Sequence, residues 1–175
     1  MSVNIAQLDG MPANEAGSLL ASCCGARAWV EAMVKRRPFA DAATLLRGAE
    51  DIWWSLDAED WLDAFAHHPR IGERDAAAGQ DERARSWSTG EQSGVAAAAP
   101  DVRTALAEGN REYEGRFGYI YLVSAAGKSA DDLLAFLQAR LANDPGTELR
   151  VAAGEQAKIT RLRLLKLLGL AEAHR

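Results

Sequence analysis

Cysteine is scarce in this 175-residue chain, and its only two cysteines, Cys23 and Cys24, are adjacent. Neighbouring cysteines rarely bond to each other, so a disulfide framework is excluded, and the adjacent pair also excludes a structural zinc site built on spaced cysteines. Free thiols fit a reducing compartment. A chain of this length buries roughly 70% of its unfolded surface without cross-links. We expect one domain over residues 1–175.

Long hydrophobic runs are also missing. A membrane-spanning helix needs about 20 mainly apolar residues, but the longest apolar run here, residues 119–123, stops at Ser124. The N-terminus lacks a basic stretch followed by an apolar core, and the C-terminus lacks a peroxisomal tripeptide or lipidation motif. A net charge of −5 argues against a general nucleic-acid binder. We expect a soluble, cytoplasmic protein that binds neither membranes nor nucleic acid.

Val, Ile and Thr are sparse whereas Ala and Leu are abundant, which favours helix over strand. Periodicity and capping residues predict an all-α, irregular bundle of about seven to nine helices. A lone strand would leave its backbone groups unpaired, so we interpret the strand-like run at residues 119–123 as a buried helical turn. The expected helices cover residues 14–22, 26–37, 41–54, 57–68, 88–99, 101–118, 129–141 and 147–169, with a polar loop at 71–85.

Two histidines, His67 and His68, precede Pro69 at the expected C-terminal end of the helix over 57–68. Free carbonyls and the negative end of the helix dipole favour imidazolium there. Such a histidine could donate a proton near neutral pH. It could equally serve only as a C-terminal cap, and the local sequence leaves both interpretations open.

Glu91 follows Ser88 at the spacing of a capping box, within the segment SWSTGEQSG. In one interpretation the carboxylate only accepts a hydrogen bond from the Ser88 backbone. In the other, the expected helix start stabilises the carboxylate and offers free N–H donors to an anionic ligand. Further candidates are Arg161 and Arg163 in the last helix, because arginine pairs well with carboxylates.

Motifs for several chemistries are missing: the Walker loop, the Rossmann glycine run, H-E-x-x-H, G-x-S-x-G and a cysteine near a histidine. Carboxylates with the spacing of di-iron bundles are missing as well. Any catalysis is therefore expected to be acid–base and electrostatic, without a metal or a nucleotide.

Four motifs in a fixed order are more specific than any residue alone. The motifs are Phe65-Ala-His-His68-Pro69-Arg-Ile-Gly72, Ser88-x-x-Glu91-Gln92-x-Gly94, Asn110-x-x-Tyr113-x-x-Arg116-Phe117-Gly118 and Arg140-Leu141-x-Asn143-Asp144. Together they closely resemble the family of OHCU decarboxylases, which act on 2-oxo-4-hydroxy-4-carboxy-5-ureidoimidazoline in urate degradation. The resemblance covers about residues 8–168 and implies an all-α, homodimeric, cofactor-free enzyme that forms (S)-allantoin. The missing peroxisomal tail suggests a bacterial-type member.

Carried over by motif, the resemblance implies that His68 is the proton donor and Glu91 the essential carboxylate. The family's arginine in the final helix matches Arg163 best, with Arg161 as the alternative. The loop between His68 and Glu91 is a few residues longer than expected, and Ile120 stands where animal members tend to have proline. The substrate-binding residues that the resemblance implies are Pro69, Ser88, Thr89, Gly90, Gln92, Tyr121, Leu122, Val123, Ser124 and Ala125.

Two other functions stay open at this point. A helical domain that binds a ureido or imidazoline anion without catalysis would use the same pocket and keep His68 as a cap. A paralogous lyase would act on a different ureido acid. The sequence also leaves open what His67 does and which surface would form the dimer.

Overall fold

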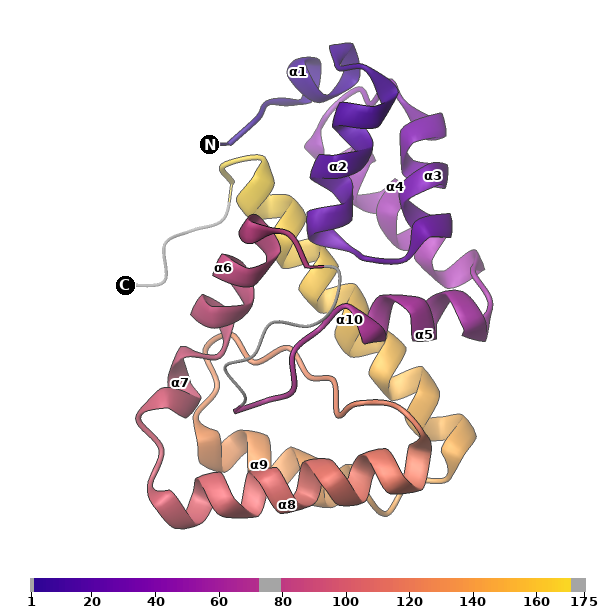
Figure 1. Cartoon of the computed structure of the whole chain (residues 1–175). Helices are drawn as coiled ribbons and strands as arrows, with labels where there is room; N and C mark the ends of the chain where they lie inside the picture. The colour runs from indigo at the N-terminus through magenta and orange to yellow at the C-terminus, as the bar shows by residue number, and fades with distance from the viewer. Residues whose placement is uncertain (1, 73–79, 171–175) are drawn as a thin grey trace. The chain divides into compact units, whose positions relative to one another are not determined.

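The computed structural model describes residues 2–72 and 80–170, and Figure 1 shows the chain trace. Helices are the only regular secondary structure in these two ranges, which confirms the all-α prediction. None of the described helices combines the length and the apolarity needed to cross a bilayer. The helices are α1 (Ile5–Gly10), α2 (Ala13–Cys23), α3 (Arg27–Arg36), α4 (Ala42–Ser55), α5 (Ala58–Ala66), α6 (Glu82–Glu91), α7 (Ser93–Ala96), α8 (Pro100–Phe117), α9 (Ala130–Arg140) and α10 (Pro145–Leu167).

The chain divides into two compact units, each described here by itself. Unit 1 comprises Met1–Ala64 and Ala157–Arg175, and unit 2 comprises Phe65–Gln156. All the predicted site residues except Arg163 fall in unit 2, so this unit carries most of the candidate site.

In unit 1, α3 packs against both α2 and α4. Buried tryptophans join the elements: the indole Nε1 of Trp29 donates to the Ala49 carbonyl at 3.0 Å, and that of Trp61 donates to the Trp53 carbonyl at 3.0 Å. A buried indole needs such a partner for its N–H. These side chains therefore serve the core of the unit.

Two helix starts confirm the predicted side-chain caps. Asp41 caps α4 by accepting from the Thr44 amide at 2.7 Å, and Ser129 forms both halves of a capping box with Asp132 at the start of α9. The sequence analysis missed α1, although Asn4 and Gln7 form a complete capping box there. Because α1 is a helix of 6 residues, it has too few apolar positions to produce a periodic signal.

The helix expected over 88–99 is wrong. Asp81 caps α6 by accepting from the Ala84 amide at 2.7 Å, so the helix begins at Glu82 and Ser88 lies inside it. The buried residues of α6 are Ala84, Ser88 and Glu91, which form a stripe of small and polar side chains. Hydrophobic periodicity could not reveal a helix whose buried face is not hydrophobic.

The helical turn expected at 119–123 is also wrong, because residues 120–125 are extended and lie in no helix. Side chains pair with this backbone where a neighbouring strand would otherwise do so. The Leu122 carbonyl accepts from Arg140 at 2.7 Å. The Ser124 amide donates to Glu155 at 2.8 Å, and its carbonyl accepts from Lys128 at 2.6 Å. Long-range side-chain partners therefore satisfy the groups that made an isolated extended segment look unfavourable.

A buried polar network connects α8, α9 and α10 in unit 2. Glu148 is 0% exposed and accepts from the Tyr113 hydroxyl, from Arg140 Nε at 2.8 Å and from Asn143 Nδ2 at 2.8 Å. Arg140 also donates to the Leu122 carbonyl, so the network extends to the extended segment. A buried ion pair is stable only with such additional hydrogen bonds.

Removing Glu148 should therefore destabilise the fold strongly. In Glu148→Leu, Arg140 stays buried without its counter-ion, and we expect a loss of about 3–5 kcal/mol in the free energy of unfolding. Tyr113→Phe removes one donor and should cost about 1.5–3 kcal/mol. Urea denaturation measures both, and Glu31→Gln in the exposed Arg27–Glu31 pair is the control that should change little. An unfolding free energy that is unchanged in Glu148→Leu would contradict the assigned role.

Candidate functional site

His68 lies just beyond the C-terminal end of α5, as the sequence predicted. α5 ends at Ala66, and the His68 amide donates to the Phe65 carbonyl at 3.1 Å, which continues the last turn. The His68 side chain is buried, whereas His67 is half-buried. Of the two adjacent imidazoles, His68 is thus the one withdrawn from solvent.

Glu91 is the last residue of α6, so the expectation that it lies at a helix start is wrong. The Gln92 amide that follows it donates to the Ser88 carbonyl at 3.1 Å, so this amide is engaged within the helix rather than available to an anion. The capping-box interpretation also fails, because Ser88 lies inside the helix. Glu91 is only 9% exposed, and burial of a carboxylate is costly unless it has a polar partner.

The residues of the segment from Ser88 to Glu91 differ in their exposure to solvent. Ser88 is buried and its hydroxyl accepts from Gln80 Nε2 at 3.1 Å. Thr89 and Gly90 are exposed, and the Thr89 hydroxyl donates to the Arg85 carbonyl at 3.0 Å within the helix. Among the described residues of this segment, Ser88 and Glu91 therefore form the buried polar face of α6.

A hydrogen bond joins the segment after His68 to the residue after Glu91. The Gly72 amide donates to Gln92 Oε1 at 3.0 Å. Gly72 lies four residues after His68, and four residues of extended chain span at most about 14 Å. Two distant parts of the sequence are thus brought into one region of unit 2.

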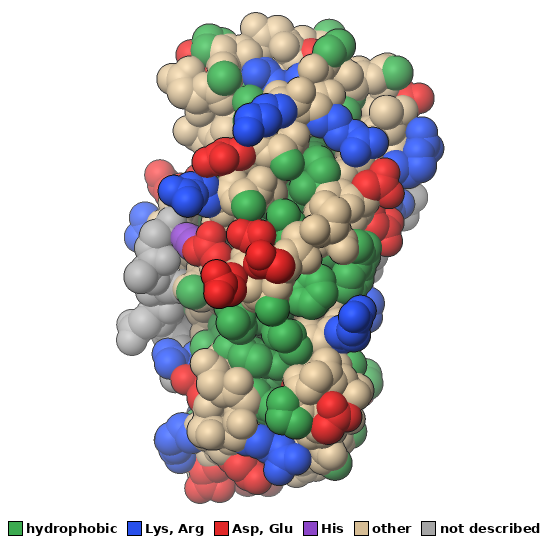
Figure 2. Space-filling model, turned by 90° about the vertical axis from the view of Figure 1, so that its right-hand side faces the viewer, with side chains coloured by type: hydrophobic (Ala, Val, Ile, Leu, Met, Phe, Trp, Pro, Cys, Tyr) green, Lys and Arg blue, Asp and Glu red, His purple; other side chains and the backbone are tan. Residues whose placement is uncertain are grey.

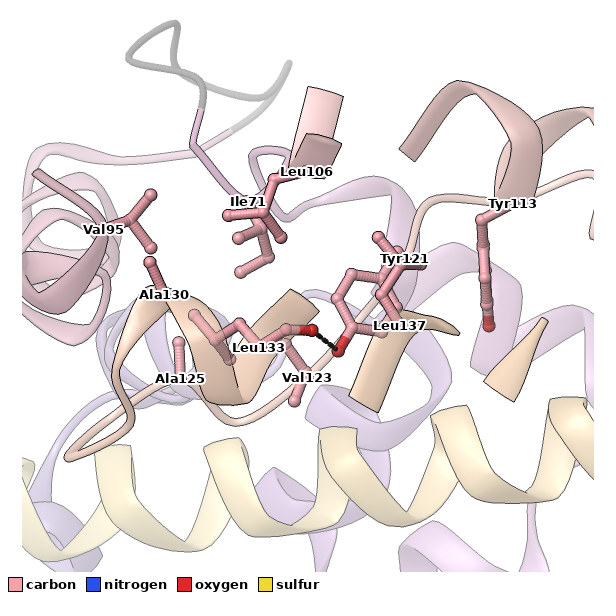
Figure 3. Close-up of a cluster of buried hydrophobic side chains, with 10 residues drawn as sticks. All are labelled: Ile71, Val95, Leu106, Tyr113, Tyr121, Val123, Ala125, Ala130, Leu133 and Leu137. Atoms are coloured by element: carbon pink, nitrogen blue, oxygen red, sulfur yellow. Dashed lines mark hydrogen bonds between the residues drawn. The ribbon is translucent and has the colours of Figure 1, made fainter. Parts of the chain in front are cut away.

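The extended segment Tyr121–Ala125 belongs to the same region. Its alternate residues Tyr121, Val123 and Ala125 are buried in a hydrophobic cluster that also contains Ile71 and Val95. Figure 3 shows these side chains together, with the Tyr121 hydroxyl donating to the Leu133 carbonyl. Leu122, which lies between them, is buried as well. Ile71 follows His68 by three residues and Val95 follows Glu91 by four, so the cluster packs close to both of the other predicted segments of unit 2.

A close backbone approach brings α7, which follows Gln92, against the backbone at Lys128. A Cβ atom built on Gly94 would lie 2.3 Å from the Lys128 carbonyl oxygen, so any side chain there would force the backbone to shift. Gly94 follows Gln92 by two residues, and Lys128 follows Ala125 by three. The glycine therefore allows the chain just after the Ser88–Gln92 segment to lie next to the chain just after the Tyr121–Ala125 segment.

A small cavity also lies in unit 2. Its volume of about 50 Å³ is well below the roughly 300–1,000 Å³ of ligand pockets, so it is too small for an organic substrate. Its lining residues are Ile71, Gly72, Val95, Arg103, Leu106, Ala107 and Asn110.

Arg163 belongs to unit 1 and is 3% exposed, whereas Arg161 is exposed. The Arg163 guanidinium donates to the Ser22 carbonyl at 3.4 Å. Of the two candidate arginines, only Arg163 has the burial expected of a ligand-pairing residue.

The Cys24 thiol lies in the same unit, and burial raises its pKa to about 11. This thiol is therefore protonated near neutral pH and unsuited to act as a nucleophile.

The sequence analysis missed the residues that hold the extended segment. Arg140 and Asn143 were noted only as part of a motif, although they belong to the network that reaches the Leu122 carbonyl. Glu155 and Lys128, which bind the Ser124 backbone, gave no signal. Their role depends on contacts that no local pattern contains.

Comparisons with known proteins agree on one family. The family model described as OHCU decarboxylase matches residues 9–165. The chain is 34% identical over 146 residues to a uric acid degradation bifunctional protein of Arabidopsis thaliana, covering 83% of this chain and 45% of that protein. It is 36% identical over 107 residues to the 2-oxo-4-hydroxy-4-carboxy-5-ureidoimidazoline decarboxylase of Mus musculus, covering 61% of this chain and 59% of that protein. The chain thus spans about half the length of these curated relatives.

Solved structures show the same similarity. A crystal structure of an OHCU decarboxylase in the presence of (S)-allantoin has a TM-score of 0.73 and 33% identity, covering 85% of this chain and 96% of that chain. A crystal structure of (S)-allantoin synthase has a TM-score of 0.72 at 18% identity, covering 95% of this chain and 54% of that chain, and shows the shared fold.

Two glycines near Glu91 provide a matched test of the packing described above. Gly94→Ala should destabilise the protein by about 1–3 kcal/mol, because its Cβ would overlap the Lys128 carbonyl. Gly90→Ala should stabilise it by about 0.5–1 kcal/mol, because a Cβ at this helical position meets nothing within 4 Å. Chemical denaturation measures both, and equal effects of the two substitutions would argue against the close approach.

Proposed function

The chain belongs to the OHCU decarboxylase family, and on this basis we propose that it decarboxylates 2-oxo-4-hydroxy-4-carboxy-5-ureidoimidazoline to (S)-allantoin. His68 is the proposed proton donor and Glu91 the proposed essential carboxylate. The observation that carries the proposal is the burial of both titratable side chains in segments that the Gln92–Gly72 hydrogen bond joins. The hydrogen bond holds the two segments that carry these side chains in one region of unit 2.

The names of substrate and product define the bond changes. The bond between ring carbon C4 and its carboxylate breaks, and carbon dioxide leaves. The electron pair forms a C4=C5 double bond, while the electrons of the imidazoline C5=N bond move to the nitrogen, which takes up a proton. The C4 hydroxyl then loses its proton as C4 becomes a carbonyl, and C5, the carbon that carries the ureido group, gains a proton. One proton is therefore taken up overall for each carboxylate lost. The reaction involves no net oxidation or reduction, so the proposal requires no redox cofactor. The face from which the proton arrives sets the handedness of allantoin.

Each proposed residue has one task in this scheme. His68 delivers the proton to one face of the ring. Glu91 orients the substrate by accepting from the ring hydroxyl or the ureido N–H, and its charge favours the protonated form of His68. Glu91 ends α6 rather than beginning it, so the expected helix start does not supply positive charge for the substrate carboxylate, and a side chain is proposed to do so. Arg163 is the proposed source.

Pro69, Ser88 and Gln92 are proposed as further contacts with the substrate, together with the segment Tyr121–Ala125. Thr89 and Gly90 are weaker candidates than the resemblance implied, because both are exposed. The burial of Ser88 and the fixed backbone of Ser124 support the remaining assignments. A pocket wall whose backbone is held by side chains keeps its shape while the substrate enters and leaves.

Replacement of His68 tests the proposal. His68→Asn should lower the catalysed rate by about 10²–10⁴-fold, because a positioned proton donor contributes that much. The substrate also decays without enzyme, so rate and handedness need separate readouts. Circular dichroism of freshly generated substrate follows the appearance of optically active allantoin, and His67→Asn is the matched control that should retain it.

The outcomes distinguish the open alternatives. Normal turnover and optical purity in His68→Asn would overturn the assignment of the proton donor. If the unsubstituted protein binds allantoin but gives only racemic product at the background rate, it is a binding domain. Turnover of a different ureido acid alone would indicate a paralogous lyase.

The two candidate arginines provide a second test. Arg163→Gln should raise KM by about tenfold or more, because it removes a charge-assisted contact with the substrate carboxylate. Arg161→Gln should leave KM unchanged, since Arg161 is exposed. Steady-state kinetics measures both, with thermal denaturation as a check that each variant folds. The reverse result would assign the role to Arg161.

A homodimer and a cytoplasmic location complete the proposal. The homodimer rests on the family resemblance, and the location rests on the free thiols and on the targeting and membrane signals that the sequence lacks. Figure 2 shows hydrophobic side chains at the surface of one face of the molecule. Exposed apolar side chains are a feature of subunit interfaces, and this supports association. The large exposed hydrophobic residues among those described are Trp54, Leu62, Phe136, Val151 and Leu170.

A further inference from the structure

Helix α8 holds the segment after His68 at two points. Asn110 Nδ2 donates to the Ile71 carbonyl at 2.9 Å. One turn further along, Glu114 forms a two-pronged ion pair with Arg70, in which Arg70 Nη2 lies 2.9 Å from Glu114 Oε2. Because Asn110 and Glu114 are four residues apart, they lie on the same face of α8. A single helix face therefore fixes two consecutive residues close to His68.

The third contact comes from the end of α6. Gln92 accepts from the Gly72 amide at 3.0 Å, and Gly72 adopts a φ of +85°, a conformation that glycine tolerates best. Side chains therefore hold residues 70, 71 and 72 in succession. A segment with three such contacts has little freedom to move the residue that precedes it.

Asn110 is an unusual choice if its role is only to fill space. It is 4% exposed, and its Oδ1 is buried without a hydrogen-bond partner among the described residues. An unsatisfied buried oxygen is unfavourable, and an apolar side chain of similar shape would avoid this cost. What an apolar residue could not supply is the donor to the Ile71 carbonyl. The amide thus matches a requirement to hold that carbonyl in place.

We infer that Asn110 is a positioning residue for His68, with the Arg70–Glu114 pair as its support. Neither needs to touch the substrate. By fixing Ile71 and Arg70, they fix the backbone that carries the imidazole, and so the ring face to which His68 delivers its proton. This inference rests on the proposed function.

The geometry of proton transfer explains the expected effect. A misplacement of about 1 Å can reduce a rate by roughly 10²-fold, while binding that other groups provide is unaffected. Loss of the Asn110 contact should therefore lower kcat and leave KM nearly unchanged. Optical purity should fall too, since a loosely held imidazole selects one face less strictly and the uncatalysed racemic reaction competes better.

The experiment compares variants of α8 with matched controls. Asn110→Ala removes the donor, and Asn110→Asp keeps the shape but places an acceptor against the Ile71 carbonyl. Glu114→Gln weakens the partly exposed ion pair with little risk to folding. Its control is Glu112→Gln, an exposed residue on the same helix. Leu8→Val, in the core of unit 1, controls for a general loss of stability.

We expect Asn110→Ala and Asn110→Asp to lower kcat by about 10–100-fold, to change KM by less than about threefold and to reduce the enantiomeric excess of allantoin. Glu114→Gln should show a smaller effect of the same kind, and both controls should show none. If Asn110→Ala lowers the melting temperature but keeps kcat and enantiomeric excess, or if it raises only KM, the inference is wrong.

A spectroscopic readout separates this inference from the proposed function. The ring nitrogens of His68 can be followed by NMR in ¹⁵N-labelled protein, with signals assigned by their loss in His68→Asn. Asn110→Ala should change their chemical shifts and titration, whereas Leu8→Val should not. Unchanged His68 signals in Asn110→Ala would overturn the positioning role even if the unsubstituted protein made no allantoin. Changed signals without any turnover would instead point to failure of the proposed function.

Discussion

The ion pair between Arg140 and Glu148 is the interaction on which unit 2 depends most. Burial disfavours the charge on Arg140, but its hydrogen bond with Glu148 and the neighbouring tyrosines outweigh this and raise the pKa of the guanidinium. Burial and the hydrogen bond to Glu148 likewise raise the pKa of Tyr113, which therefore remains a donor. Arg140 then holds the Leu122 carbonyl. The family resemblance assigns a pocket wall to Tyr121–Ala125. A charged side chain, Arg140, thus binds the backbone of this segment where a neighbouring strand would otherwise do so.

The parts of the fold that the sequence predicted are those with local causes. Asp41 and Ser129 cap helices through contacts three residues along the chain, and such contacts can be recognised from the sequence alone. The segment 119–125 could not be predicted in the same way, because the Leu122 carbonyl is bound by Arg140 and the Ser124 amide by Glu155, and both partners lie far along the chain. An isolated extended segment becomes favourable only when these distant side chains are in place.

In the candidate site, too, the features with local causes could be predicted from the sequence and the others could not. Pro69 marks the end of α5 in the sequence, so the position of His68 beyond that end was predictable. Glu91 was placed at a helix start because Ser88 has the spacing of a capping box, yet Asp81 provides the actual cap seven residues earlier. The local sequence does not show whether Asp81 or Ser88 begins the helix, because the residues between them carry no apolar stripe. The family resemblance identified His68 and Glu91 as candidates, whereas only the structure shows the surroundings of their side chains.

The reversed position of Glu91 also bears on its proposed pairing with His68. Glu91 ends α6 and His68 follows α5, so both lie at a helix C-terminus, where the dipole favours positive charge. A buried carboxylate gains nothing from this field and needs a polar or cationic partner. An imidazolium gains from it and supplies a positive charge. The proposed proton donor has to act in its imidazolium form, and the end of a helix is a position that favours this form.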